Sequence, residues 1–181
     1  MSKYVIETEN LRKEYNGHAV VDSLSLHVPE GRIYALLGRN GAGKTTTMKM
    51  LLNLIQPSGG KICLFGENHS DFSKKHYHRI GSVIESPAFY ENLTAEENLE
   101  ILARLRGRHR RDTVEHALSV VNLDRENKKL FREYSLGMKQ RLGLAAAVMH
   151  EPELLILDEP INGLDPVGIH ETREYLLQLC R

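Results

Sequence analysis

The 181-residue sequence has few cysteines, no net charge and no long apolar run. Its two cysteines, Cys63 and Cys180, lie far apart and offer neither a disulfide framework nor metal-ligand spacing, which is typical of a reducing cytosol. Lysine plus arginine equals aspartate plus glutamate at 24 each, so the overall charge does not favour nucleic acid or an anionic membrane surface. No window approaches about 20 uninterrupted apolar residues, and no apolar signal segment opens the chain. We therefore expect any membrane role to come through a partner.

The strongest motif is a glycine-rich stretch between an apolar run and a helix-like segment. Residues 38–45 read Gly-Arg-Asn-Gly-Ala-Gly-Lys-Thr and fit the pattern Gly-x-x-x-x-Gly-Lys-[Ser/Thr]. The apolar run 33–37 predicts a strand before this motif, and a helix to about Ile55 is expected after it. Glycines let the backbone turn tightly, so that successive N–H groups and the helix N-terminus can face phosphate oxygens. Lys44 would then reach the β- and γ-phosphates of a nucleotide, and Thr45 would place its hydroxyl on Mg²⁺.

Alternating apolar residues predict half-buried strands from residue 4 to about residue 28, with a hairpin turn at Asn16-Gly17. Tyr15 ends the first strand of this hairpin, where its ring could stack on a nucleobase; a packed surface tyrosine is the alternative. Segments 61–66 and 80–85 read as further strands.

The middle of the chain is more polar. His69, His76 and His78 lie in a segment that favours a solvated loop and helix over a metal site. A helix is predicted over 92–106, with Thr94 and Glu97 forming a capping box, and a second helix over 113–121. The arginine-rich run 104–111 could contact phosphate, but an exposed interhelical loop is favoured there.

Two adjacent carboxylates follow a second apolar run. Residues 134–141 lead into a helix of small residues predicted at 142–149, and the run 154–157 is a continuous apolar strand of the kind found in parallel sheets. This strand ends on Asp158 and Glu159, whose carboxylates are costly there unless metal or hydrogen bonds satisfy them. Asp165 is expected to cap, and Pro166 to open, a last helix running to Cys180.

In this order the motifs resemble the nucleotide-binding ATPase subunit of an ABC transporter over essentially the whole chain. Residues 38–45 match its Walker A loop, 154–158 its Walker B strand and 162–165 its D-loop. The resemblance implies an α/β fold: a P-loop NTPase (RecA-like) core with an N-terminal antiparallel β subdomain and a helical signature subdomain. The expected parts of this single domain, 1–181, are the β subdomain and P-loop core at 1–84, the helical subdomain at 85–144, and the Walker B and D-loop core at 145–181.

The resemblance also implies roles for single residues. Tyr15 would stack on adenine, Asp158 would hold Mg²⁺ directly or through water, and Glu159 would polarise the attacking water as general base. Glu85 stands where the family usually has a glutamine that links Mg²⁺ and the attacking water to the transmembrane partner; a surface residue is the alternative. Catalysis would thus involve Glu159, Lys44 and Glu85, and the metal would be bound by Thr45, Asp158 and Glu85. The expected nucleotide contacts are Tyr15, Gly38, Arg39, Asn40, Gly41, Ala42, Gly43, Lys44, Thr45 and Thr46.

Residues 134–138 correspond to the family signature Leu-Ser-Gly-Gly-Gln, of which Ser135 and Gly137 are retained while Leu136 and Met138 depart. In the family the two retained positions touch the γ-phosphate bound on the opposite subunit, through a hydroxyl, a backbone N–H and a helix N-terminus. The resemblance therefore implies a head-to-tail homodimer or heterodimer with ATP between the subunits. It also implies transmembrane permease subunits, a cytoplasmic position at the inner face of the cell membrane, and no nucleic-acid partner.

The glutamate at position 85 and its surroundings resemble the bacterial ATPases of lantibiotic self-immunity exporters, close to the bacitracin-export group. The resemblance implies ATP hydrolysis that drives export of a peptide antibiotic, and a general drug or peptide exporter is the alternative. The permease subunits largely choose the substrate.

The family carries a further buried strand that ends in a switch histidine, farther beyond Glu159 than the 22 residues that follow it here. Neither His150 nor His170 stands in that context, so we expect the C-terminal part of the fold to be missing. A truncated, non-hydrolysing nucleotide-binding fragment is therefore a rival interpretation. A soluble ABC protein acting on ribosomes or DNA is disfavoured, because such proteins usually carry tandem cassettes or long coiled coils.

Overall fold

The computed structural model describes residues 4–69, 74–85, 87–107, 111–123 and 128–180. The chain divides into two compact units, Met1–Ser73 with Cys180–Arg181 and Lys74–Leu179, and each is described by itself. The single domain expected for residues 1–181 stays a prediction. Residues 108–110 of the arginine-rich run lie outside the described residues. Over the described part of the chain, no helix is long and apolar enough to cross a bilayer.

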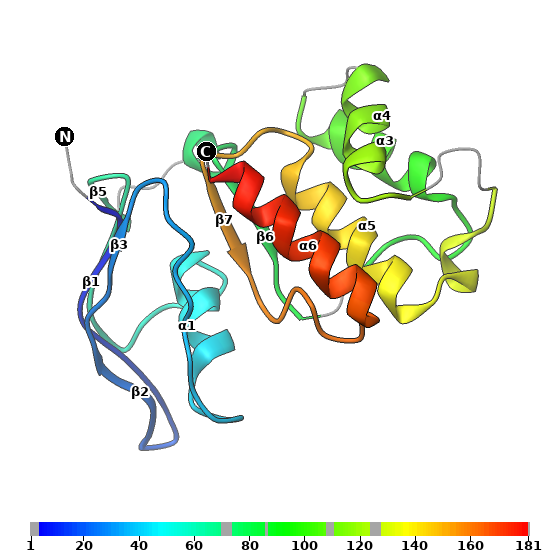
Figure 1. The fold of residues 1–181 in the computed structure, drawn as a ribbon. Helices are drawn as coiled ribbons and strands as arrows, with labels where there is room; N and C mark the ends of the chain where they lie inside the picture. The colour runs from blue at the N-terminus through cyan, green and yellow to red at the C-terminus, as the bar shows by residue number, and fades with distance from the viewer. Residues whose placement is uncertain (1–3, 70–73, 86, 108–110, 124–127, 181) are drawn as a thin grey trace. The chain divides into compact units, whose positions relative to one another are not determined.

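An antiparallel sheet forms most of the first unit (Figure 1). Its strands run in the order β2-β1-β4-β5, with β3 also paired to β1. The strands are β1 (Tyr4–Tyr15), β2 (His18–Leu24), β3 (His27–Pro29), β4 (Gly59–Leu64) and β5 (Glu67–Asn68). The hairpin predicted at Asn16-Gly17 is confirmed, because Tyr15 pairs with His18 and both turn residues have positive φ, 50° and 79°. Positive φ at both central residues is what a tight type I′ hairpin turn requires.

The strand predicted at 33–37 is not formed, and that prediction is wrong for this structure. Ile33 and Leu37 are 55% and 88% exposed, and no described strand pairs with the segment. A strand is stabilised by hydrogen bonds to a neighbouring strand, so an apolar run without one stays irregular. The helix after the loop, α1 (Lys44–Leu51), also ends before the predicted Ile55, because the chain turns into the left-handed region at Asn53, φ 56°.

His69 is buried at 9% exposure, which corrects the expectation of a solvated side chain. Its ring Nε2 lies 3.1 Å from the carbonyl oxygen of Leu51, the last residue of α1. Burial lowers the pKa of this imidazole, while the hydrogen bond to the carbonyl acts in the opposite direction. The histidine therefore ties the end of β5 to the end of α1 rather than facing solvent.

The second unit combines a short parallel sheet with helices. Its elements are α2 (Lys74–Tyr77), β6 (Ile80–Val83), α3 (Ala95–Leu105), α4 (Arg111–Val120), the 3₁₀ helix η2 (Phe131–Glu133), α5 (Leu136–Val148), β7 (Leu154–Leu157) and α6 (Pro166–Leu179). β6 and β7 pair in parallel, as expected for the apolar run 154–157. Helices α3, α4 and α5 pack on one another (Figure 1). The core among them includes the fully buried Leu99, Leu118 and Leu142.

Local signals explain where two of these helices begin. The capping box predicted for α3 is confirmed: Thr94 Oγ1 accepts from the Glu97 N–H, and Glu97 Oε2 accepts from the Thr94 N–H at 2.8 Å. α5 begins at Leu136, well before the predicted start at 142, because Ser135 serves as its N-cap and accepts from the Met138 N–H at 3.3 Å. The retained signature serine therefore sits at a helix N-terminus.

Candidate nucleotide-binding site

The glycine-rich loop leads directly into the N-terminus of α1. Gly41 and Gly43 have φ of 81° and 82°, in the left-handed region that glycine adopts without a steric penalty. Gly43 is the N-cap of α1, so no side chain caps the helix, and the first turn contains no acidic residue. The first N–H groups of a helix have no partner within it, and the helix dipole adds partial positive charge there. This end of α1 is thus suited to an anion.

Gly43 also packs too closely on β2 for any side chain. A Cβ at this position would lie 2.5 Å from the carbonyl oxygen of Val20 and 2.8 Å from Cγ2 of Val21. At Gly41 nothing would lie within 4 Å of such a Cβ. The loop is therefore fixed against the sheet at its helix end and open at its tip, where a ligand can approach the backbone.

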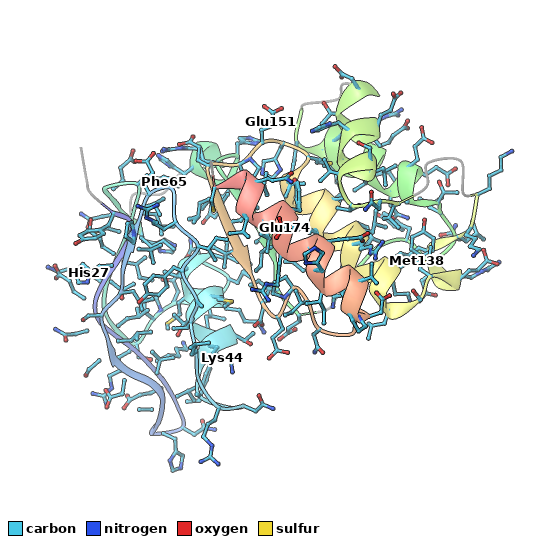
Figure 2. All side chains as sticks on the ribbon, in the orientation of Figure 1. His27, Lys44, Phe65, Met138, Glu151 and Glu174 are labelled. Carbon is cyan, nitrogen blue, oxygen red and sulfur yellow. The ribbon has the colours of Figure 1, made fainter. Side chains whose placement is uncertain are left out.

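Lys44, the first residue of α1, folds back over the loop (Figure 2). Its Nζ donates to the carbonyl oxygens of Gly38 at 2.9 Å and Arg39 at 3.2 Å. Thr45 follows on the first turn of the helix, and Thr47 Oγ1 donates to the Gly43 carbonyl at 2.9 Å. The ammonium therefore lies over the loop whose N–H groups would hold phosphate, which fits the predicted contacts of a nucleotide.

Tyr15 lies in the same unit, at the end of β1. Its side chain is 47% exposed, and the Nζ of Lys13 lies 5.0 Å from the ring centroid. An aromatic ring with this exposure can stack on a nucleobase, and the role of Tyr15 stays a prediction.

Three carboxylate residues follow the two parallel strands of the second unit. Val83 pairs with Leu157, and the Asp158 N–H continues the ladder by donating to the Val83 carbonyl at 2.8 Å. Because parallel strands in register end at the same edge of a sheet, Glu85, Asp158 and Glu159 emerge together. Carboxylate oxygens are the ligands that Mg²⁺ prefers. Among the described residues, however, no three His, Cys, Asp or Glu side chains are grouped so that they could hold a metal ion, and the metal role of Glu85 and Asp158 stays a prediction.

The backbone at two of these residues is unusual. Glu85 and Glu159 have φ of 59° and 48°. Positive φ is uncommon for residues other than glycine and clusters at functional sites. The two turns redirect the chain shortly after the strands. Seven other non-glycine residues among those described also have positive φ, so this feature alone assigns no role, and the roles of both glutamates stay predictions.

An amide that sequence reasoning missed contacts the predicted general base. Asn162 Nδ2 donates to Glu159 Oε2 at 3.2 Å, and its backbone N–H donates to the Glu159 carbonyl at 3.0 Å. The only signal in the sequence is an amide residue three positions after the carboxylate. Beyond it, Asp165 Oδ1 accepts from the Gly168 N–H at 3.1 Å, and Pro166 is the first residue of α6, so the predicted cap is confirmed.

The signature residues lie at the start of α5. Ser135 is exposed, whereas Gly137 is half-buried, and a Cβ there would lie 3.4 Å from Cδ2 of Leu164. Met138, the departure from the family glutamine, is half-buried against the helical core, which gives a physical reason for an apolar side chain at that position (Figure 2). Ser135 and Gly137 belong to the same unit as Asp158 and Glu159, whereas the phosphate loop belongs to the other.

Comparisons with known proteins show which sequences and structures the chain is similar to. The model of the ABC transporter family matches residues 21–162. The chain is 61% identical to the bacitracin transport ATP-binding protein BcrA of Enterococcus faecalis, over 98% of this chain and 58% of that protein. It is 40% identical to the lantibiotic transport ATP-binding protein SrtF of Streptococcus pyogenes, over 95% of this chain and 73% of that protein. A solved ATP-binding subunit of an ABC transporter is 32% identical, with a TM-score of 0.85 over 97% of this chain and 75% of that one.

The chain thus spans little more than half the length of its bacitracin relative. The solved structure confirms the predicted α/β fold of the P-loop NTPase type. With the family model covering most of the sequence, the chain belongs to the ABC transporter family.

Proposed function

We propose that this chain binds ATP with Mg²⁺ and hydrolyses it as part of an ABC exporter that moves a peptide antibiotic of the bacitracin or lantibiotic kind. One observation carries the nucleotide part of the proposal. The N-terminus of α1 has no side-chain cap, it follows two glycines with positive φ, and the Lys44 ammonium lies over the loop. Such an arrangement binds a polyphosphate through backbone N–H groups and one lysine.

In this proposal, each residue has the role in phosphate binding, metal binding or proton transfer that its side-chain chemistry allows. The loop 38–43 and Lys44 hold the phosphates, while the hydroxyl of Thr45 and the carboxylates of Asp158 and Glu85 would hold the metal. Bound Mg²⁺ neutralises phosphate charge during phosphoryl transfer. Glu159 orients and deprotonates the attacking water, and Asn162 holds one oxygen of that carboxylate. Catalysis is thus mainly positioning and charge stabilisation.

A second ATPase subunit completes the site in this proposal. Ser135 and the first turn of α5 form an exposed helix N-terminus that can meet the γ-phosphate held by a partner subunit. Permease subunits carry the peptide through the membrane and place the ATPase at its cytoplasmic face. The names of the similar bacitracin and lantibiotic transport proteins support the substrate class.

Turnover of Mg²⁺-ATP by the purified chain tests the catalytic part. We expect Glu159→Gln to retain ATP binding and to lower kcat by at least about a hundredfold, because the water loses its base. Glu153→Gln is the matched control: the same substitution just before β7, at a carboxylate that pairs with Arg79 at 2.7 Å. Equal turnover in wild type and Glu159→Gln would rule out the role of Glu159.

The transport part needs a cell-based measurement. Expression of the chain with a candidate permease should raise tolerance of bacitracin or of a lantibiotic, and Lys44→Ala should abolish the gain. Tolerance that survives Lys44→Ala would contradict an energy-coupled role.

Nucleotide binding without turnover is the rival function. The exposed segment 33–37 directly before the phosphate loop favours it: the segment pairs with no strand among the described residues, and a segment without such pairing positions the loop less firmly. Under this rival, wild type and Glu159→Gln bind ATP equally and neither releases phosphate.

A further inference from the structure

The leucine that departs from the family signature lies directly on a glycine of the D-loop segment. A Cβ built on Gly163 would lie 2.3 Å from Cδ2 and 2.8 Å from Cγ of Leu136. Gly163 has a φ of 76°, so its backbone also favours glycine. The leucine side chain therefore occupies the space that any side chain at position 163 would need.

Other contacts join the same two segments. A Cβ at Gly137 would touch Cδ2 of Leu164 at 3.4 Å, and one turn further along α5 the Arg141 guanidinium pairs with Glu171 of α6 at 3.2 Å. The first turns of α5 are thus held to the segment 163–171 by an apolar contact at one end and an ion pair at the other. Among the α5 residues that make these contacts, Leu136 is the nearest to Ser135 in the sequence.

The first residue of the D-loop, Asn162, contacts the predicted base. Asn162, the neighbour of Gly163, donates to Glu159 Oε2 at 3.2 Å. The path from the signature serine to the base therefore passes through adjacent residues and two contacts: Ser135 caps α5, Leu136 packs on Gly163, and Asn162 binds Glu159.

We propose that Leu136 is a positioning residue: seated on Gly163, it sets the place of the D-loop segment and, through Asn162, the orientation of the Glu159 carboxylate. The inference rests on the proposed ATP hydrolysis. A γ-phosphate bound by a partner subunit at Ser135 would then influence the base of the subunit that supplies this serine. Leu136 itself is 57% exposed, so this coupling rests on its direct contact with Gly163 and not on burial in a core.

A double-mutant cycle on the full chain tests the contact. Wild type, Leu136→Ala, Gly163→Ala and the double variant are compared for Mg²⁺-ATP affinity and for kcat. We expect Leu136→Ala and Gly163→Ala each to lower kcat by at least about tenfold with affinity changed by less than about twofold, because only the base is displaced. Once Leu136 is replaced by alanine, Gly163→Ala should cost clearly less than it does beside the leucine, since the clash is gone and only the strain of alanine at a φ of 76° remains.

Two controls separate positioning from general damage. Gly107→Ala introduces the same change at a φ of 68° with nothing within 4 Å of the new Cβ, and kcat should be retained. Leu136→Met keeps an apolar side chain of similar volume and should retain kcat within about threefold.

The outcomes are distinct. Losses that multiply independently in the double variant, or a Leu136→Ala chain with wild-type kcat, overturn the inference while leaving ATP hydrolysis intact. A wild-type chain that binds ATP without turnover overturns both the inference and the proposed hydrolysis.

Discussion

Replacing either of two loop glycines by alanine separates backbone preference from close packing at the phosphate loop. Gly41 and Gly43 have nearly the same φ, 81° and 82°, so the cost of placing alanine in the left-handed region is nearly equal, about 1 kcal/mol each. Alanine also reduces the entropy of the unfolded chain by the same amount at both positions, so this contribution cancels in the comparison.

The two positions differ in the space around the new methyl group. It meets nothing within 4 Å at Gly41, but at Gly43 it lies 2.5 Å from the Val20 carbonyl oxygen. A clash with backbone cannot be relieved by a rotamer change, so we expect Gly43→Ala to cost about 1–3 kcal/mol more than Gly41→Ala. Urea unfolding followed by circular dichroism measures both free energies. Equal destabilisation by the two variants would refute the packing of the loop against β2.

Two further predictions concern stability. Thr94→Ala should lower the free energy of unfolding by about 1 kcal/mol, because α3 loses its side-chain cap, whereas Thr94→Ser keeps a capping hydroxyl and should retain most of that stability. Thermal melts of both variants measure the difference. Burial lowers the pKa of His69 below its ordinary 6.5, so the unfolded chain takes up a proton before the folded one does, and stability should fall as pH drops below 6.5. His69→Gln, whose amide can donate to Leu51, should show a shallower fall over this range in urea titrations, and an identical pH profile would contradict the assignment.

The features that the sequence predicted well are those fixed by neighbours in the chain. The Asn16-Gly17 turn, the capping box at Thr94 and the cap at Asp165 each depend on a few consecutive residues whose side chains or φ preferences decide the local geometry. The apolar run 154–157 was also recognisable, because a strand in a parallel sheet carries apolar residues at consecutive positions.

The features that the sequence could not predict depend on distant partners. The run 33–37 has strand composition, yet a strand forms only where another strand offers hydrogen bonds, and no described strand does. His69 looked solvated because its neighbours are polar, whereas its burial comes from the end of α1. Likewise, no spacing in the sequence indicates that Leu136 lies on Gly163.

The first residue of α5 was predicted wrongly for a different reason, because the signal that sets it is local. The small residues after 142 indicate a helix there, but the N-cap at Ser135 sets an earlier start and places residues 136–138 of the signature in the helix. The family resemblance predicts a phosphate contact for Ser135, and the structure adds that this serine is the N-cap of α5. The two roles are compatible, since both place its hydroxyl at an exposed helix N-terminus.

The affinity of the purified chain for Mg²⁺-ATP, measured calorimetrically for wild type and Lys44→Ala, tests the central claim that the loop 38–43 and α1 form a phosphate site. Lys49→Ala, on the last turn of the same helix, is the matched control for loss of a lysine. We expect one ATP to bind per wild-type chain. The affinity of Lys44→Ala should be lower by at least about tenfold, because a charge-assisted contact to phosphate is lost, whereas Lys49→Ala should bind with wild-type affinity. Equal affinities of wild type and Lys44→Ala, or no binding by wild type, would contradict the account.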